Sequence, residues 1–539
     1  MKQLNILFAA LLAAALSLST AELAAQIIPP VPRDKRGRID AEREGFHDAN
    51  NIRTVFLNYG MVGDFKPAGV DVSVFHSAEI PKGSGVNYTD GVTPFVLAKI
   101  RLTNGDSLYL METGYRERQE DSPFGPYVMR FEPRPGYFEA NPSLNKGRSP
   151  AISNDQRTWP TTWPDKDVTW DGSWNGYFGK VPAADQESFT VMDDDYYDKW
   201  RRGSTHGSYF PDSRDSTRRG LGLRVEVRGF QWSNPQAANV IFWHYDITNE
   251  STTDYPRNGE PENIIFGLYM DSGIGGSSAG CDGVYESDDD NAQFDTTTGL
   301  NLVYTWDYFG HGVGLSSNCY PTGYLGYAYL ETPGKPEDMM DNDNDGIVDE
   351  KRDAGPGILI EGRDAILAAV AARYDTVKFR LLIGSPSLRP AVRAEQWWTG
   401  DEDMDWIALA DDVGADGLDG TNDPGEGDGR PTEGEPHFDR TDKDESDQIG
   451  LTGFQMNYIT NGTDNVLFYK RDLGNGHPDW PKELYDKWTG SNRFDFRTGG
   501  TRINIGFLFA SGPFTLKAGK TERPVRPSAS ASLLHTALI

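Results

Sequence analysis

The segments NVIFWHYDIT at residues 239–248 and IIFGLYM at residues 264–270 decide the fold class of this 539-residue chain. Both are rich in β-branched and aromatic residues and are separated by Asn, Asp, Pro and Gly, which is typical of strands. Just upstream, LRVEVRGF at residues 223–230 alternates apolar and charged side chains. Such alternation predicts a strand that buries one face and exposes the other.

The same strand signals recur along most of the chain. Asn104-Gly105 separates two apolar runs, residues 95–102 and 107–111, and this arrangement predicts a β-hairpin. An Ala-rich segment at residues 364–374 is the one clear predicted helix. Further strands are predicted at residues 300–306, 324–330, 466–469 and 503–510. Strands outnumber helices, and no fixed repeat suggests a propeller or solenoid, so we expect a mainly β protein: an antiparallel β-sandwich core with long acidic Gly-rich loops and few helices.

Composition shifts divide the chain into regions. We expect a signal peptide at 1–25, an N-terminal β-rich region at 26–150, a Trp/Asp-rich region at 151–235, a β-sandwich region with a calcium loop at 236–400, an acidic Gly-rich loop at 401–450, C-terminal strands at 451–523 and an irregular tail at 524–539. The tail lacks strand alternation and any strong amphipathic period. We therefore expect it to be a truncated or out-of-frame end.

The N-terminus carries an export signal. Lys2 precedes an apolar run at residues 4–16, and small residues follow it, which is the pattern of a secretory signal peptide. The run is too short to span a bilayer, and no later stretch is apolar enough, so we expect a secreted or outer-surface protein without a transmembrane segment. In an oxidising compartment Cys281 and Cys319 are expected to form a disulfide, the alternative being two free thiols.

Acidic residues dominate the charge: 81 Asp and Glu face 52 Lys and Arg, for a net charge of −29. This excludes nucleic acid as a natural partner, because phosphate binding needs clustered basic residues. The negative charge is concentrated in three loops, with net charges of −6 at 282–295, −5 at 338–353 and −15 at 401–447. Acids crowded in this way repel each other unless a cation neutralises them.

The sharpest acidic motif is DNDNDGIVDE at residues 341–350. Acids two residues apart converge on one ion in a tight loop, and Gly at the sixth position permits the sharp turn. We expect a Ca²⁺ site with these ligands: the carboxylates of Asp341, Asp343, Asp345 and Asp349, and the carbonyl of Ile347. Position 12 is Arg352 instead of the usual Glu, and Glu350 or Asp353 is the candidate replacement. The motif resembles the loops of thrombospondin type 3 repeats, and the alternative is a solvated turn without an ion.

Two further acidic segments are candidate Ca²⁺ sites, since hard carboxylate oxygens favour calcium over softer metals. Acids alternate with Gly from residue 411 to 428, where the candidate ligands are Asp412, Asp416, Asp423, Glu426 and Asp428. The alternative for this segment is a disordered acidic loop. The second segment pairs Asp271, at the end of a predicted strand, with Asp288 and Asp290. Its alternative is a surface acid run.

Catalytic motifs are weak, so an enzyme is not the preferred interpretation. GSSAG at residues 276–280 matches the nucleophile-elbow pattern but lacks the flanking strand and helix that the pattern needs. Trp159, Trp163, Trp170, Trp174 and Trp200 are interleaved with Asp residues. Aromatic platforms beside carboxylates are typical of glycan binding or hydrolysis. The preferred alternative is that these rings pack in the core.

Several segments together resemble a group of uncharacterised large secreted proteins of gliding-type, Bacteroidota-like bacteria. The resemblance rests on residues 240–249, 266–271 and 509–516, the Asp triplet 288–290 and the loop that begins at Asp341. Members often carry a C-terminal sorting domain for outer-membrane secretion, and we expect none within residues 1–539. No activity is established for the group, so the resemblance implies no catalytic residue. The function hypothesis is an exported calcium-binding β-sandwich protein with a structural or adhesive cell-surface role and an extracellular glycan or protein as partner; the alternative is a secreted carbohydrate-binding or glycan-hydrolysing protein.

Overall fold

The computed structural model confirms a mainly β protein whose named strands all pair antiparallel. It describes residues 28–531 apart from 67–68, 72, 116–129, 171, 178, 197–208, 258, 277–279, 298–299, 337, 352–354, 439–445, 459–479, 496–502 and 523–524. The expected signal peptide, the expected strand at residues 466–469 and Trp200 lie outside this described part of the chain.

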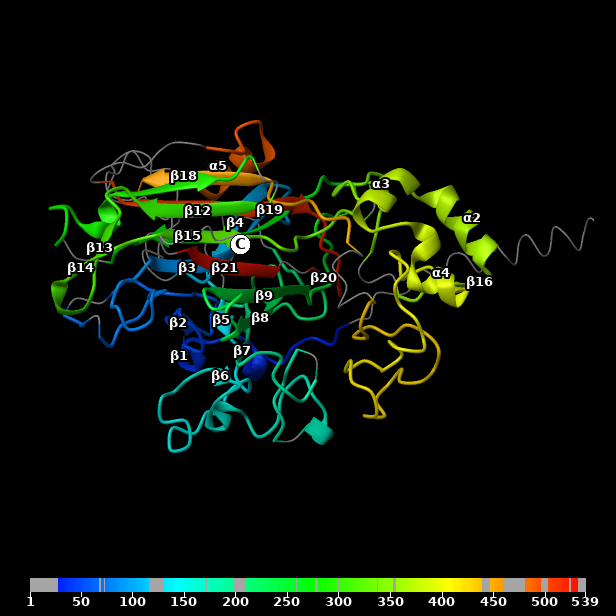
Figure 1. Ribbon diagram of the computed structural model, residues 1–539, viewed down its shortest axis with the longest axis horizontal. Coiled ribbons are helices and arrows are strands. Elements are labelled where there is room, and N and C mark those ends of the chain that lie inside the picture. The colour runs from blue at the N-terminus through cyan, green and yellow to red at the C-terminus, as the bar shows by residue number, and fades with distance from the viewer. Residues whose placement is uncertain are drawn as a thin grey trace, which may run out of the picture.

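Two large sheets form the body of the molecule (Figure 1). The five-stranded sheet has the order β18 (Gly453–Tyr458), β19 (Ile505–Phe514), β10 (Ile264–Ser272), β3 (Thr89–Arg101) and β4 (Ser107–Thr113). The ten-stranded sheet has the order β11 (Asp290–Phe294), β12 (Leu302–Asp307), β15 (Tyr324–Ala328), β21 (Val525–Ala531), β9 (Val240–Asn249), β8 (Leu223–Gln231), β7 (Gln186–Asp193) and β5 (Glu132–Pro133), with β20 (Thr521–Glu522) beside β9 and β6 (Ala151–Ile152) beside β7.

The two sheets pack face to face through aromatic side chains. The ring of Tyr245 on β9 lies 5.8 Å from that of Phe266 on β10, and the rings of Tyr327 on β15 and Phe509 on β19 are 5.7 Å apart. All four side chains belong to one large hydrophobic core. Large apolar side chains of alternate strand positions therefore fill the space between the sheets, as expected for a sandwich.

The predicted hairpin is confirmed by β3 and β4, whose register ends at Arg101 opposite Ser107. Gly105 has φ +90° in the connecting turn, a backbone conformation that other residues seldom adopt. The predicted helix at residues 364–374 is present as α2 (Arg363–Arg373).

Strand β8 was predicted to bury one face and expose the other, but the structure differs. Its polar side is also covered, because Glu226 and Arg228 are buried. Arg228 donates a hydrogen bond to Glu187 on β7 at 2.8 Å, and its guanidinium stacks over the ring of Phe189. The covering layer is the Trp/Asp-rich region, which forms a second core on this face. A buried ion pair permits charged residues where the period alone predicts solvent.

The expectation of an irregular tail at residues 524–539 is wrong for its first half. Strand β21 (Val525–Ala531) completes the ten-stranded sheet by pairing with β9 and β15. Backbone hydrogen bonds on both edges hold this strand, so a Ser- and Ala-rich sequence without alternation enters the sheet.

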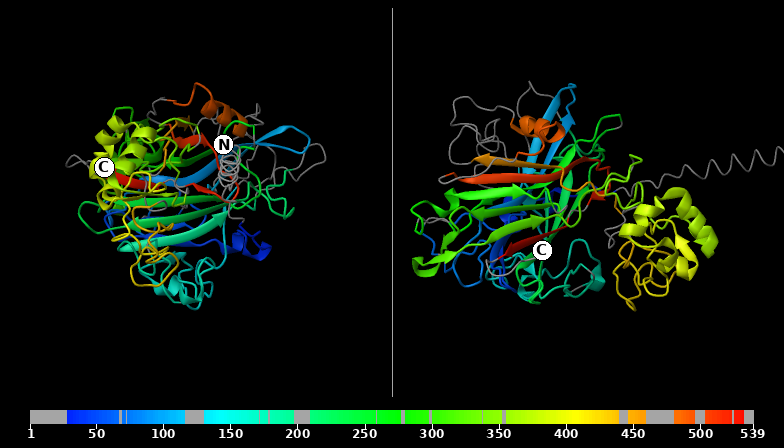
Figure 2. Two further views of the ribbon diagram at one scale, coloured as in Figure 1. Left: turned by 90° about the vertical axis from the view of Figure 1, so that its right-hand side faces the viewer. Right: turned by 45° about the horizontal axis from the view of Figure 1, so that its top comes forward.

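A separate lobe, residues 336–447, projects from one end of the sandwich (Figures 1 and 2). It contains β16 (Leu359–Glu361), α2, α3 (Thr376–Leu382), α4 (Pro390–Ala394) and β17 (Gln396–Trp398), followed by the long Gly-rich loop. Its own small core includes Ile347, Phe379, Trp397 and Met404. Elsewhere, β1 (Glu44–His47) pairs with β2 (Thr54–Leu57), β13 (His311–Val313) pairs with β14 (Cys319–Pro321), and α5 (Trp480–Thr489) packs on β4.

Candidate metal centre

The predicted calcium loop lies where the lobe joins the sandwich. The chain enters the lobe at Gly334 and leaves it at Gln448, and these two residues form an antiparallel bridge. Lys335 N–H donates to the carbonyl of Asp447 at 2.9 Å, and Ile449 N–H donates to the carbonyl of Pro333 at 3.1 Å. These two antiparallel segments thus form a narrow neck, and Asp447 lies on one of them.

Carboxylates from the loop and from the neck form two overlapping groups. Oxygens of Asp343, Glu350 and Asp447 lie within 4.8 Å of one another, and so do oxygens of Asp341, Asp343 and Asp345. Asp343 belongs to both groups. These five carboxylates are called the neck centre below, and each of the two groups could hold a metal ion.

Glu350 is the member of the neck centre that most strongly indicates a bound cation. Its side chain is 1% exposed, and neither carboxylate oxygen has a hydrogen-bond partner in the described structure. Burial, followed by the charges of Asp345 and Asp343, raises the pKa of Glu350 to about 10. A buried carboxylate without a donor is costly unless it is protonated or bound to a cation.

Two other members of the neck centre also have raised pKa values. Burial and the charge of Asp345 raise the pKa of Asp343 to about 7, and burial raises the pKa of Asp447 to about 6. One basic side chain is seen to help: Lys378 Nζ on α3 lies 2.7 Å from Asp341 Oδ2. A divalent cation would neutralise part of the negative charge that remains.

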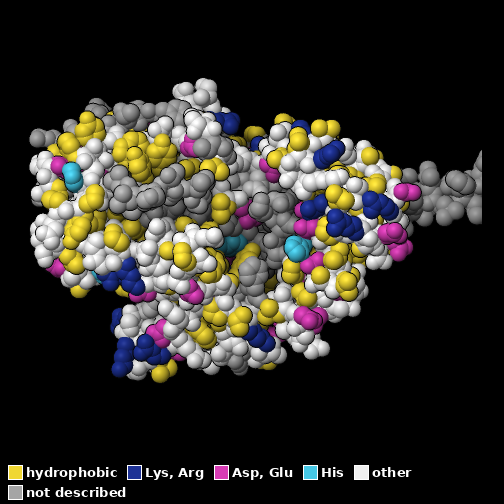
Figure 3. All heavy atoms as spheres, in the orientation of Figure 1, with side chains coloured by type: hydrophobic (Ala, Val, Ile, Leu, Met, Phe, Trp, Pro, Cys, Tyr) yellow, Lys and Arg dark blue, Asp and Glu magenta, His cyan; other side chains and the backbone are white. Residues whose placement is uncertain are grey.

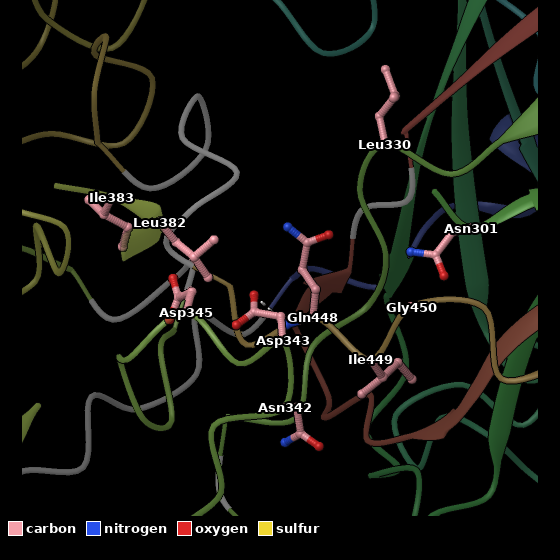
Figure 4. Close-up of a pocket in the computed structure, with 10 residues that line it drawn as sticks. All are labelled: Asn301, Leu330, Asn342, Asp343, Asp345, Leu382, Ile383, Gln448, Ile449 and Gly450. Carbon is pink, nitrogen blue, oxygen red and sulfur yellow. Dashed lines mark hydrogen bonds between the residues drawn. The ribbon is translucent and has the colours of Figure 1, made fainter. Parts of the chain in front are cut away.

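A cleft of about 520 Å³ opens beside the neck centre (Figure 4). Asp343 and Asp345 line it together with Leu382 and Ile383 of the lobe, and Asn301 belongs to its sandwich side. Gln448 N–H donates to Asp343 Oδ2 at 3.4 Å across the neck. The carboxylates therefore face the junction between lobe and sandwich. On the face seen in Figure 3, acidic side chains of the lobe are interspersed with Lys and Arg.

Two further predicted ligands of the loop are Ile347 and Asp349. Ile347 places its side chain in the lobe core, where it is 1% exposed, and its N–H donates to Asp345 Oδ1 at 2.8 Å. Asp349 Oδ1 accepts from Met339 N–H at 2.8 Å, and the Asp349 carboxylate groups with those of Asp338 and Asp447. The sequence motif thus extends into a larger cluster that Asp447 links to the neck.

The acids predicted at residues 412–428 are not brought together into a ligand group within the described structure. Backbone N–H groups of the Gly-rich loop surround them instead. Asp412 accepts from Gly427 and Gly429, and Glu426 accepts from Gly420. The remaining candidates act in the same way: Asp416 accepts from Leu418, Asp423 from Asp416 N–H, and Asp428 from Arg430 N–H.

Asp271, Asp288 and Asp290 likewise form no such group in the described residues. Asp271 at the end of β10 accepts from the Tyr115 hydroxyl at 2.9 Å, and Asp290 accepts from Ile274 N–H at 3.0 Å. Asp288 lies partly exposed in the turn before β11. Asp290 instead faces Asp307 across the β11–β12 ladder, and burial raises the pKa of both carboxyls.

The sequence analysis missed one acidic group and the contribution of Asp447 to the neck centre. Asp401, Asp403 and Asp405 bring their oxygens within 4.8 Å of one another and could hold a metal ion. The alternate acids at residues 401–405 are the signal that could have found them. Nothing in the local sequence joins Asp447 to Asp343, because the two are brought together only by the neck.

The structure shows the outcome for the predicted disulfide and for the Trp-rich region. Cys281 and Cys319 form a disulfide with Cα atoms 5.7 Å apart. Trp163, Trp170 and Trp174 are buried in the second core. Their rings therefore pack against β7 and are not a platform for a glycan, as the preferred interpretation had it.

Comparisons with known proteins add no identity. A scan of protein-family models and a search of curated sequences find no match for this chain. Among the described residues, no helix has the length and apolar character needed to cross a membrane.

Proposed function

We propose that the chain is an exported calcium-binding protein in which an ion at the neck centre holds the lobe against the β-sandwich. The observation that carries this proposal is Glu350, a buried carboxylate without a hydrogen-bond donor that lies within 4.8 Å of Asp343 and Asp447. An ion there would cross-link the loop that begins the lobe to the residue that ends it.

Calcium is the cation that suits this chemistry. The members of the neck centre offer carboxylate oxygens, which bind hard cations, and they form two groups of three that share Asp343. Magnesium requires a stricter octahedron and retains its water, so it suits such a crowded site less well. Extracellular calcium sites bind at about 10⁻⁴–10⁻³ M, which is sufficient in a calcium-rich medium.

The role that follows is structural or adhesive, at the cell surface. The disulfide between Cys281 and Cys319 supports an oxidising compartment, which agrees with the secretory signal in the sequence. A stapled lobe that projects from a rigid sandwich presents a fixed surface to an extracellular glycan or protein. The resemblance to secreted proteins of gliding-type bacteria supports the same location.

Calorimetry of the full chain tests the proposal. A cation that binds only the native state raises its unfolding free energy by about 2.7 kcal/mol at a hundredfold excess over Kd. We expect calcium to raise the melting temperature and chelation to reverse the rise. Glu350→Gln should remove most of the gain, whereas Asp419→Asn, on an exposed acid of the Gly-rich loop, should keep it. If the melting temperature of the wild-type chain is the same with and without calcium, the proposal is refuted.

A further inference from the structure

The lobe contains a second acidic group beside its own small core. Asp401, Asp403 and Asp405, called the lobe-core centre below, lie on the loop that follows β17. Met404, between two of these acids, is 0% exposed and sits in the lobe core. Ile347 of the calcium loop enters the same core, so both acidic loops are anchored by one apolar side chain each.

Asp401 is the member that points to an ion. Its side chain is 0% exposed. Asp401 Oδ1 accepts from Asp405 N–H at 3.0 Å, but Oδ2 is buried without a hydrogen-bond partner. Burial has removed the hydration of this oxygen, and no hydrogen bond replaces it. That state is unfavourable unless a cation contacts the oxygen.

A basic side chain lies beside the lobe-core centre. The guanidinium of Arg389 at the start of α4 contacts Asp403, and its Nη2 lies 3.2 Å from Asp405 Oδ2. Three ionised carboxylates with one guanidinium leave a net charge of −2. One divalent cation neutralises that charge, and the ligands are again hard oxygens.

We propose that the lobe-core centre binds a second divalent cation and that its occupancy is coupled to that of the neck centre. The coupling runs through Glu402, whose carboxylate accepts from Lys351 N–H at 2.8 Å, directly after Glu350. The Tyr374 hydroxyl also donates to the carbonyl of Glu402 at 2.9 Å. Ordering either loop therefore orders a backbone segment that the other loop contacts. The second site uses residues outside the neck centre and does not depend on the proposed function, whereas the coupling rests on it.

Metal analysis of the full chain, equilibrated with calcium and freed of unbound ion, tests the second site. We expect two ions per wild-type chain, one in Asp401→Asn, one in Glu350→Gln, and two in the control Asp419→Asn. An ion content in Asp401→Asn equal to that of the wild-type chain would overturn the second site. An ion content in Glu350→Gln equal to that of the wild-type chain would instead refute the neck centre.

Terbium luminescence gives a readout that does not depend on a fully buried substitution. Trp397 Nε1 donates to the carbonyl of Asp401 at 2.6 Å, so Tb³⁺ at the lobe-core centre lies near an indole that sensitises its emission. Asp405 is partly exposed, and Asp405→Asn should fold and lose most of that emission. Emission as strong as in the wild-type chain would overturn the assignment.

Titration calorimetry tests the coupling. We expect Asp405→Asn to weaken calcium binding at the neck centre about fivefold or more, the lower end of typical coupling between sites. Neck-centre affinity equal to that of the wild-type chain would show that the two sites are independent and would overturn the coupling.

Discussion

Replacing Glu350 with Gln should change the stability of the chain in opposite directions with and without calcium. In the cation-free protein the pKa of Glu350 is about 10, against an ordinary value of 4.5. The folded state therefore keeps a proton that the unfolded state releases, and stability falls as pH rises from 4.5 towards 10. At about 1.4 kcal/mol per pH unit, the loss is at most about 5 kcal/mol at pH 8 and under about 1 kcal/mol at pH 5.

Gln cannot ionise, so the variant avoids this loss. We expect cation-free Glu350→Gln to be more stable than the cation-free wild-type chain at pH 8 and to differ little from it at pH 5. With calcium the order reverses, because the variant lacks one carboxylate ligand. The assay is denaturant unfolding of metal-free and calcium-loaded protein at both pH values. The reasoning is refuted if the cation-free variant is less stable at pH 8, or if calcium stabilises both proteins equally.

Three further predictions concern other parts of the structure. Replacing Cys281 and Cys319 with Ser opens a link between residues 38 apart and should lower the unfolding free energy by about 4 kcal/mol, measured by denaturant unfolding. Lys378→Gln removes the ammonium that contacts Asp341 and should raise calcium affinity a few-fold in titration calorimetry; unchanged or weaker binding would contradict it. Trp174→Ala removes a fully buried ring and should cost about 3–5 kcal/mol in denaturant unfolding.

The main strands could be predicted because their side chains carry the period of the sheet. The runs at residues 239–248 and 264–270 became β9 and β10, each within two residues of the predicted ends. The exceptions are informative. β21 lacks alternation because backbone pairing to two neighbours holds it, and the polar face of β8 is buried because Glu187 pairs with Arg228. Both depend on segments far away in the chain.

The acidic loops show the same division between local and distant information. The motif at residues 341–350 predicted the convergence of Asp341, Asp343 and Asp345, because acids two residues apart in a tight Gly turn point to one side. An equally acidic segment at residues 412–428 behaves differently, since its own backbone N–H groups satisfy the carboxylates. Composition alone could not separate these two outcomes.

The sequence by itself determined a mainly β chain, one helix of the lobe and the first acidic loop. These depend on neighbours a few residues apart, whose side chains share a face or a turn whatever the rest of the chain does. Tertiary structure alone decided that Asp447 joins Asp343 across the neck, and that Glu350 and Asp401 lie buried. Burial and convergence over a hundred residues arise from packing, and they determine whether a carboxylate remains solvated or requires an ion.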